Sequence, residues 1–519
     1  MEESAITKRR EKMTLGEVIR SHYANDLNDY WIPPLVSCKD GVAEGRVCDG
    51  DTVIFCCRRG EREIQLMESF VEKSFSEFET KAFNDLRFLP LVQYHKKFTS
   101  TKSIIPATMI DGTLGEAISR AGLKQLAVTE SEKEAHVTFF FNGRRNSLYM
   151  GQVAQIIPSW KDFKAHPEMK SSEIGIAVER SMDRYDFVIV NFPAGDVIGH
   201  LQDMNLKIKA AEEIDRALGS IYNQAKSLGT TLIITADHGL MEKGITEEGV
   251  PSVSHTTAPV PFVVVNDRLK RNTFLEESGS LADVAPTILA LLGLEKPGEM
   301  TGNSLIARPL MSSSVVLVIL DGWGEGEDNP LVNPLKAAKT PVLDFLRRSY
   351  PHTTLKASEE AVGLPSGRSG NSETGHLTIG AGRVIEQDEL RIERAIVTGF
   401  RNEKVLKDTI ESMRESSSLH LIGLLSEASS HGNTKEMLAI LDFARSKGVE
   451  KIYGHLILDG RSAPPRSALD LLEKYNEDLK KMQIVTVLGR GYALDRSRDY
   501  TGKTKLFYDA LVYGRGECY

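Results

Sequence analysis

The sequence predicts an α/β protein with two domains. Three observations support this: a length of 519 residues, a composition of 41% hydrophobic and 26% charged residues, and apolar runs that alternate with amphipathic segments. A chain of this length exceeds one ordinary domain and is sufficient for two large ones. Apolar runs that alternate with helical segments are typical of parallel sheets whose strands are connected by helices.

The apolar runs fall into two series. The first comprises residues 186–192, 230–239, 260–265 and 315–322, which are bounded by turn residues, as buried central strands are. Between the first two runs, the segment MNLKIKAAEEIDRALGSIYNQAKSLG carries apolar side chains at helical spacing and ends at a glycine, which predicts a helix. The second series follows residue 417: SLHLIGLLSEA, IYGHLILDG and QIVTVLG. Residues 298–314, rich in small residues, Pro and Gly, are predicted to form a surface connection.

Charge and cysteine content restrict the partners and the compartment. The net charge is −8, and Lys and Arg are scattered among Asp and Glu, so we expect no nucleic-acid partner. The cysteines are few, odd in number and unevenly spaced, which predicts reduced thiols rather than a disulfide framework. The first twenty residues carry charges throughout, and no apolar run reaches the length of a membrane helix. We therefore expect a cytoplasmic protein that does not bind a membrane.

Oxygen and imidazole donors lie next to several predicted strands. Asp196 and His200 are four residues apart, so a helical turn places both on one face, where they can share a cation. Taken alone, such a pair is more often a helix cap and a surface histidine. Similar donors lie beside three further strands, in TADHG, SVSHTTAPVPF and ILDGWG: Asp237, His238, His255 and Asp321. Because open α/β sheets gather ligands at strand ends, the set predicts a dinuclear metal site.

A glycine-rich segment, residues 363–383, contains Ser372. Its glycines allow the backbone to approach a ligand closely, and its N–H groups can face an anion. The alternative is a loop in which the serine only caps a helix. A serine hydroxyl becomes a good nucleophile when a base or a metal lowers its pKa, and a cation at the predicted metal site would do this.

Seven stretches resemble the cofactor-independent (2,3-bisphosphoglycerate-independent) phosphoglycerate mutases of the alkaline phosphatase superfamily: ILDGWG, TPVLDFLRRSYPHTTLKASEEAVGLP, GNSETGHLTIGAGR, LILDGRSAPPRSAL, EKEAHVTFFFNG, TADHG and HTTAPVPF. The order is rotated. Residues 315–395 resemble the family's beginning, residues 396–519 and then 14–104 its transferase domain, and residues 105–310 its closing part. Such a circular permutation is tolerated when the old termini lie close together and the new ones fall in an exposed loop.

The resemblance implies an alkaline-phosphatase-like metal domain at residues 105–395 and a smaller α/β transferase domain, assembled from residues 1–104 and 396–519. It implies a monomer that binds two divalent ions, Mn²⁺ or Mg²⁺. One ion would be held by Asp321, Ser372, Asp237 and His238, and the other by Asp196, His200 and His255. Ser372 would take the phosphoryl group from phosphoglycerate and return it to the other hydroxyl of the bound glycerate, which interconverts 3-phosphoglycerate and 2-phosphoglycerate.

The family's substrate-binding positions fall on seven residues: Arg59, Arg62, Lys133, His431, Arg461, Arg490 and Arg496. Taken singly, each is more often a solvated surface charge. The expected transferase half also departs from the family in three places. CCRRGER lacks the proline between the two arginines, Asn433 replaces a second histidine, and Ser462 replaces an aspartate beside the substrate hydroxyls.

The aspartate that Ser462 replaces is thought to shuttle a proton in the family. Its loss predicts a weak mutase that releases phosphate to water. Two alternatives therefore stay open: a metal-dependent phosphatase, and a mutase-derived binding or regulatory protein that does little chemistry.

Overall fold

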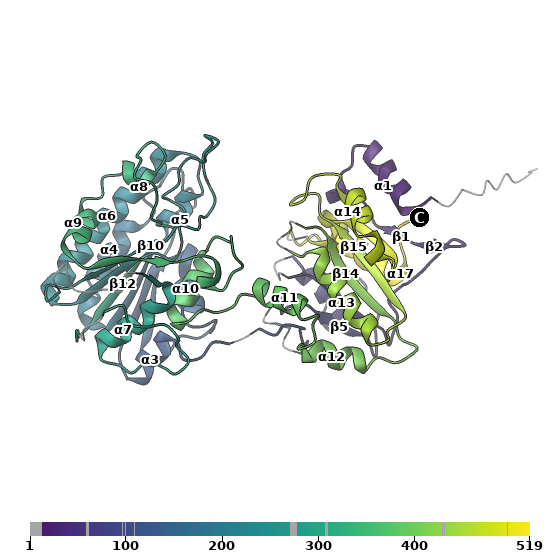
Figure 1. Ribbon diagram of the computed structural model, residues 1–519, viewed down its shortest axis with the longest axis horizontal. Helices are drawn as coiled ribbons and strands as arrows, with labels where there is room; N and C mark the ends of the chain where they lie inside the picture. Colours follow the sequence, from purple (N-terminus) through teal and green to yellow (C-terminus); the bar gives the residue numbers. More distant parts are fainter. Residues whose placement is uncertain are drawn as a thin grey trace, which may run out of the picture. The chain divides into compact units, whose positions relative to one another are not determined.

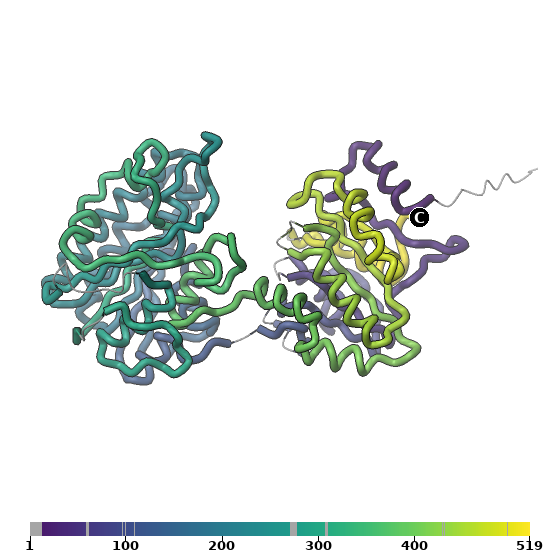
Figure 2. Tube along the Cα trace, viewed as in Figure 1, coloured from purple at the N-terminus to yellow at the C-terminus, as the bar shows by residue number. Residues whose placement is uncertain are grey.

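Segments from opposite ends of the chain share one unit of the structure. In the computed structural model, unit 1 comprises residues 1–107 and 391–519, and unit 2 comprises residues 108–390 (Figure 1, Figure 2). The resemblance placed the corresponding boundaries after residues 104 and 395. The structure describes residues 13–58, 62–95, 97–98, 100–107, 109–269, 278–306, 310–427, 429, 431–495 and 497–519.

Unit 2 is built around an eight-stranded sheet with the order β11-β13-β10-β9-β12-β8-β6-β7. Its strands are β6 (Gln125–Glu130), β7 (Gln152–Ile157), β8 (Phe187–Phe192), β9 (Thr231–Thr235), β10 (Val260–Val265), β11 (Gly279–Ser280), β12 (Val315–Leu320) and β13 (His352–Lys356). The four runs predicted to be central strands are β8, β9, β10 and β12, which are neighbours in the sheet. β10 is antiparallel to β9. This corrects the expectation of a parallel sheet, and its cause is that residues 236–259, which connect the two strands, contain no crossover helix.

Helices cover both faces of this sheet. α4 (Ser171–Glu179), α6 (Met204–Leu228) and α9 (Pro341–Ser349) lie on one side, and α3 (Leu114–Arg120) and α7 (Val284–Leu292) lie on the other (Figure 1). The predicted helix is α6, and it ends at a glycine with a left-handed conformation, φ 67°. The apolar faces of sheet and helices form one continuous core.

Unit 1 contains a seven-stranded sheet with the order β17-β1-β16-β15-β14-β4-β5. Its strands are β1 (Leu35–Val36), β4 (Thr52–Phe55), β5 (Arg87–Pro90), β14 (Leu419–Leu425), β15 (Ile452–Leu458), β16 (Gln483–Gly489) and β17 (Glu517–Cys518). β14 pairs in parallel with β4, so the first hundred residues and the last hundred build one sheet. In Figure 1 purple segments from the first hundred residues lie in the same unit as the green and yellow ones.

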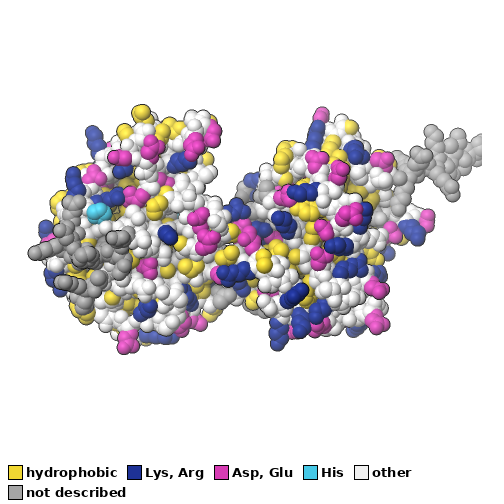
Figure 3. Space-filling model, viewed as in Figure 1, with side chains coloured by type: hydrophobic (Ala, Val, Ile, Leu, Met, Phe, Trp, Pro, Cys, Tyr) yellow, Lys and Arg dark blue, Asp and Glu magenta, His cyan; other side chains and the backbone are white. Residues whose placement is uncertain are grey.

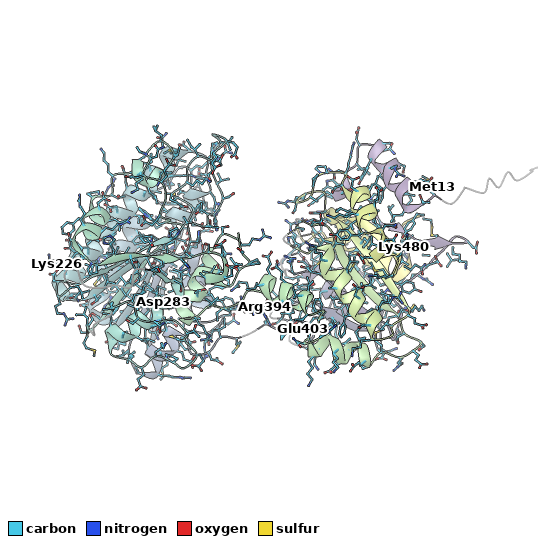
Figure 4. All side chains as sticks on the ribbon, in the orientation of Figure 1. Met13, Lys226, Asp283, Arg394, Glu403 and Lys480 are labelled. Carbon is cyan, nitrogen blue, oxygen red and sulfur yellow. A yellow bond between two sulfur atoms is a disulfide. The ribbon has the colours of Figure 1, made fainter. Side chains whose placement is uncertain are left out.

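Helices and a small hairpin complete unit 1. Its helices include α2 (Ile64–Val71), α13 (Thr434–Ser446) and α17 (Lys505–Tyr513). α11 (Asp388–Val397) carries Arg394, and α12 (Lys404–Glu411) follows it and precedes β14. Glu403, labelled with Arg394 in Figure 4, is the N-terminal cap of α12. The hairpin consists of β2 (Cys38–Lys39) and β3 (Val42–Ala43).

One pair of cysteines departs from the expectation of reduced thiols. Cys38 and Cys518 form a disulfide across a sequence separation of 480 residues. They are brought together because β17 pairs in parallel with β1, at the edge of the unit 1 sheet. The remaining cysteines are free thiols: Cys48, Cys56 and Cys57. Cysteine count and spacing carry no information about such a pairing, because the fold alone creates it.

The segment predicted as a surface connection is partly buried. Met300, Leu305 and Ile306 pack into the core of unit 2. Asp283, labelled in Figure 4, accepts a hydrogen bond from the backbone N–H of Asn303 at 2.8 Å. Apolar side chains therefore anchor residues 300–306 of this segment to the core.

Charges of both signs are intermixed on the face of the molecule seen in Figure 3. Among the described residues, no helix is both long and apolar enough to cross a membrane.

Candidate functional site

Donors predicted from the sequence meet at the carboxyl ends of three neighbouring strands of unit 2. β8 leads into α5 (Ala194–Gly199), which carries Asp196 in its first turn. β9 ends just before Asp237 and His238, and β12 ends just before Asp321. Because these strands are adjacent in the sheet, their ends bring the side chains together.

Ser372 lies among these donors. It is the first residue of α10 (Ser372–Ala381), and its Oγ donates a hydrogen bond to Oδ1 of Asp321 at 3.0 Å. The same Oγ lies 3.0 Å from Nε2 of His238 and 2.6 Å from Nζ of Lys133. All four residues are buried, with His238 and Asp321 fully inaccessible to solvent. The nucleophile proposed from the sequence is therefore enclosed by acid, imidazole and ammonium groups.

The N-terminal cap of α10 distinguishes between the two sequence interpretations of Ser372. The cap is Asn371, whose side chain accepts a hydrogen bond from the backbone N–H of Thr374 at 3.0 Å. Thr374 in turn completes a reciprocal capping box with Asn371. Ser372 does not cap the helix, so its hydroxyl is free to act within the donor cluster.

Lys133 bridges the two ends of the donor cluster. Its Nζ lies 2.7 Å from Oδ2 of Asp196 and 3.1 Å from Oδ2 of Asp321. Burial acts to lower the pKa of Lys133, but the carboxylates of Asp321, Asp196 and Asp237 raise the pKa well above its usual value. The side chain is therefore a fixed positive charge beside Ser372.

Two histidines present unprotonated nitrogens to Asp196. The Nδ1–H of His200 donates to the carbonyl of Val253 at 2.8 Å, and the Nδ1–H of His255 donates to the carbonyl of Gly370 at 2.9 Å. In the neutral rings, each Nε2 is therefore an acceptor. Nε2 of His255 lies 3.1 Å from Nε2 of His200 and 3.1 Å from Oδ1 of Asp196. Three acceptors that converge in this way suit a cation between them.

A divalent metal fits this donor set. Two groups of ligand atoms lie within 4.8 Å of one another: Asp196, His238 and His255, and Asp237, His238 and Asp321. Asp237 Oδ2 is buried and has no hydrogen-bond donor among the described residues. Nδ1 of His376 lies 3.2 Å from this oxygen, but it donates instead to the carbonyl of Ser372 at 2.9 Å. A buried carboxylate oxygen without a donor is costly unless a cation binds it.

The charges within the cluster shift the pKa values of His238 and Asp237 in the direction opposite to the effect of burial. Burial acts to lower the pKa of His238, but the charges of Asp237, Asp321 and Asp196 raise it to about 9. Burial also acts to raise the pKa of Asp237, and the positive charge of His238 and its neighbours holds that pKa well below its usual value. The carboxylate of Asp237 is therefore ionised, as a ligand for a metal must be.

A second group of polar side chains lies at the carboxyl ends of the unit 1 strands. Arg490, directly after β16, donates to Oδ1 of Asp459 at 2.5 Å. The same nitrogen, Nη1, lies 3.3 Å from Oγ of Ser429 and 3.2 Å from Oγ of Ser462. The resemblance implied a substrate-binding guanidinium at Arg490, and the structure places it beside the departure at Ser462.

His431 is buried against a carboxylate. Its Nδ1 lies 3.0 Å from Oε1 of Glu63, and both residues are buried. Burial raises the pKa of Glu63, and the hydrogen bond with His431 opposes this shift. The neighbouring Asn433 caps α13, because its side chain accepts from the backbone N–H of Lys435 at 3.0 Å. The residue that replaces the family's second histidine is therefore occupied in a helix cap.

The remaining arginines predicted to bind substrate differ in their surroundings. Arg62 is buried and donates to the carbonyl of Leu494 at 3.3 Å. Arg461 is exposed, and it makes no hydrogen bond or ion pair within the described part of the chain. Arg59 and Arg496 lie outside the described residues.

Two profiles of known families match parts of the chain. Residues 37–296, half of its length, match the profile of the Metalloenzyme superfamily. The chain belongs to the Metalloenzyme superfamily. A second profile, described as the BPG-independent PGAM N-terminus, matches residues 392–519.

Relatives named 2,3-bisphosphoglycerate-independent phosphoglycerate mutase are similar over part of the chain. The protein from Moorella thermoacetica is 38% identical over 296 residues, which cover 56% of this chain and 57% of the relative. That from Listeria monocytogenes is 39% identical over 298 residues, 56% of this chain and 58% of the relative. The match thus spans little more than half the length of these relatives. A crystal structure of Leishmania mexicana phosphoglycerate mutase at low cobalt concentration is 28% identical, covers 52% of this chain and 53% of that chain, and has a TM-score of 0.41.

Sequence reasoning missed Glu242, a buried residue that connects three donor-bearing loops of this superfamily member. Its carboxylate accepts from the backbone N–H of Leu240 at 2.8 Å, from the backbone N–H of Gly324 at 3.1 Å, and from the hydroxyl of Thr256. These partners lie close in sequence to His238, Asp321 and His255 respectively. The position of Glu242 in TADHGLME, just past two recognised donors, is the signal that was available.

Lys207 was also missed, because it appears in the sequence as part of an amphipathic helix. Its side chain is fully buried, and its Nζ donates to the carbonyl of Ser252 at 2.6 Å. Burial lowers the pKa of Lys207 to about 8. The next carbonyl, that of Val253, is the one that orients His200. Lys207 therefore supports the loop on which the orientation of His200 depends.

Proposed function

We propose that this protein is a metal-dependent phosphoglycerate mutase that interconverts 3-phosphoglycerate and 2-phosphoglycerate through a phosphoserine at Ser372, without bisphosphoglycerate. The observation that carries the proposal is the contact of Ser372 Oγ with Asp321, His238 and Lys133 inside a cluster of metal-type donors. A serine that only packs in the core does not require charged groups around its hydroxyl, whereas a nucleophile for phosphoryl transfer requires them for its activation.

The proposed ligands follow the assignment from sequence. One ion, Mn²⁺ or Mg²⁺, would be held by Asp321, Ser372, Asp237 and His238, and a second by Asp196, His200 and His255. When bound, divalent ions would lower the pKa of the serine hydroxyl and neutralise charge on the phosphoryl oxygens. The residues themselves do the rest: Lys133 stabilises negative charge beside Oγ, and the carbonyls of Val253 and Gly370 keep the imidazoles in the ligating tautomer.

The substrate-binding groups proposed for unit 1 are cationic or imidazole side chains: Arg62, His431, Arg461 and Arg490, with Arg59 and Arg496 assigned from the sequence alone. Guanidinium groups suit both the phosphoryl group and the carboxylate of phosphoglycerate. The ion pair of Arg490 with Asp459 fixes this guanidinium in one orientation.

We also propose that the chain is a circular permutant of its relatives. A profile described as an N-terminus matches the last 128 residues of this chain, positions 392–519. The first hundred residues complete the sheet that those residues build.

A metal-dependent phosphatase is the second candidate, because Ser462 offers Arg490 a hydroxyl where the relatives of the resembled family have a carboxylate. One experiment separates the two functions. The purified protein is incubated with Mn²⁺ and 3-phosphoglycerate, and both 2-phosphoglycerate and inorganic phosphate are measured. The proposal requires 2-phosphoglycerate as the main product without added bisphosphoglycerate. Phosphate as the main product would establish the phosphatase instead.

A further inference from the structure

Return of the phosphoryl group to glycerate requires a proton acceptor. The attacking hydroxyl must lose its proton as it bonds to phosphorus, and a positioned acid–base group typically accelerates such a step about 10²- to 10⁴-fold. Ser462 cannot accept a proton near neutral pH. If the proposed function is correct, another side chain must do so, and this inference rests on that function.

Two carboxylates near the strand ends of unit 1 are already engaged. Oδ1 of Asp459 pairs with Arg490, and its Oδ2 accepts from the hydroxyl of Ser426 and from the backbone N–H of Ala463, each at 2.9 Å. Glu436 forms an ion pair with Arg58. Each carboxylate therefore already accepts hydrogen bonds from other groups of the protein. Neither residue is suited to take the proton.

His431 has the nitrogen that these carboxylates lack. Glu63 accepts the Nδ1–H of His431, and its other oxygen accepts the backbone N–H of Arg62 at 2.9 Å. This contact leaves Nε2 of His431 as the basic nitrogen. Within the described part of the chain, no group forms a hydrogen bond with that nitrogen. A buried carboxylate behind an imidazole with one open nitrogen is an acid–base pair whose tautomer is fixed in advance.

Hydrogen bonds also connect the pair with Ser462. The backbone N–H of His431 donates to Oγ of Ser429 at 3.2 Å, and Nη1 of Arg490 contacts both that oxygen and Oγ of Ser462. Two hydrogen-bonded residues, Ser429 and Arg490, therefore connect His431 with Ser462. Glu63 and His431 are separated by 368 residues in sequence, so only the assembled unit 1 creates the pair.

We propose that His431 is the catalytic acid–base residue of the mutase and that Glu63 is its positioning residue. In the first half-reaction, the deprotonated oxygen of Ser372 bonds to phosphorus, the bond from phosphorus to the substrate oxygen breaks, and protonated His431 gives its Nε2 proton to that substrate oxygen. In the second, the other hydroxyl bonds to phosphorus, its proton moves to Nε2, and the electron pair of the broken phosphorus–oxygen bond stays on the oxygen of Ser372. The proton given in the first step is recovered in the second.

The test compares two substrates in the full-length protein loaded with Mn²⁺. p-Nitrophenyl phosphate loses its leaving group as a stable anion, so phosphorylation of Ser372 by this compound needs no acid. His431→Gln should lower the isomerisation of 3-phosphoglycerate about 10²- to 10⁴-fold and leave the release of p-nitrophenol unchanged. His95→Gln, at an exposed histidine of the same unit, should affect neither.

A second variant tests the positioning role. Glu63→Gln should lower kcat for isomerisation and leave KM for 3-phosphoglycerate unchanged, because Glu63 does not touch substrate. Isomerisation by His431→Gln at the wild-type rate would overturn the inference, as would equal losses with both substrates or a change confined to KM in Glu63→Gln. A wild-type protein that releases p-nitrophenol but does not isomerise 3-phosphoglycerate would instead refute the proposed function.

Discussion

The packing of α10 against Asp237 makes Gly375 a sensitive test of the site. Gly375 lies one helical turn after Ser372, and a Cβ built there would lie 2.4 Å from the carbonyl oxygen and 2.8 Å from Cβ of Asp237. Ordinary contact begins near 3.4 Å, so Gly375→Ala requires α10 and Asp237 to separate by about 1 Å. The substitution therefore moves the nucleophile relative to a proposed metal ligand without changing either side chain.

Stability and activity should respond differently to this displacement. Overpacking costs about 1 to 3 kcal/mol, and replacing a glycine in a helix by alanine recovers about 0.5 to 1 kcal/mol. The net loss of unfolding free energy should therefore lie between about 0 and 2.5 kcal/mol. A displacement of 1 Å in a reacting group can cost about 100-fold in rate. We expect a folded protein whose Ser372 phosphorylation is about 100-fold slower.

The assay measures urea unfolding by circular dichroism and Ser372 phosphorylation by p-nitrophenyl phosphate with Mn²⁺. Gly298→Ala is the matched control, because a Cβ at that position of unit 2 would meet no atom within 4 Å. The control should behave as wild type in both measurements. Phosphorylation at the wild-type rate in Gly375→Ala would show that the contact of α10 with Asp237 does not determine the geometry of the site.

Four further predictions address other features of the protein. Exhaustive chelation should abolish turnover, and Mn²⁺ should restore it better than Ca²⁺, because imidazole ligands suit the softer ion; full activity after chelation would contradict this. Lys207→Met should weaken the binding of one of two Mn²⁺ ions about tenfold in equilibrium dialysis, whereas Lys209→Met, at an exposed neighbour, should not; equal affinities would exclude a supporting role for Lys207. His455 is fully buried beside His420, and burial holds its pKa well below 6.5. Because only the unfolded state then takes up the proton, the free energy of unfolding should fall by about 1.4 kcal/mol per pH unit as the pH drops below about 6.5. His455→Gln should remove this slope in urea titrations. Deletion of all residues after 400 should leave unit 2 folded and the first hundred residues sensitive to protease, because those residues lack their partner strands; protease resistance there would show an independent unit.

Elements with a local signature were predictable from the sequence. The strands β8, β9, β10 and β12 are continuous apolar runs, and their burial requires that pattern. Asp237 and Asp321 stand directly after such runs, so their position at one edge of the sheet followed from the strand assignment. The parallel direction assumed for β10 was wrong, because an apolar run carries no information about strand direction.

Features that depend on distant pairing were not predictable. Glu63 meets His431, and Cys38 meets Cys518, only after both ends of the chain have built the unit 1 sheet. Glu242 was missed for a different reason: its role consists of hydrogen bonds to backbone N–H groups and a hydroxyl, which have no sequence signature. Periodicity and motifs identify donors, whereas the residues that hold donors in place require coordinates.

The central claim is that phosphoryl transfer passes through Ser372 in a metal-dependent step. The most direct measurement is to mix the Mn²⁺-loaded protein with 3-phosphoglycerate labelled in its phosphoryl group, quench with acid within one turnover, and map the label by mass spectrometry. The account predicts a labelled phosphoserine at Ser372 that is absent from Ser372→Ala and from chelated protein. Labelled 2-phosphoglycerate formed without phosphoserine, or formed by Ser372→Ala, would contradict it.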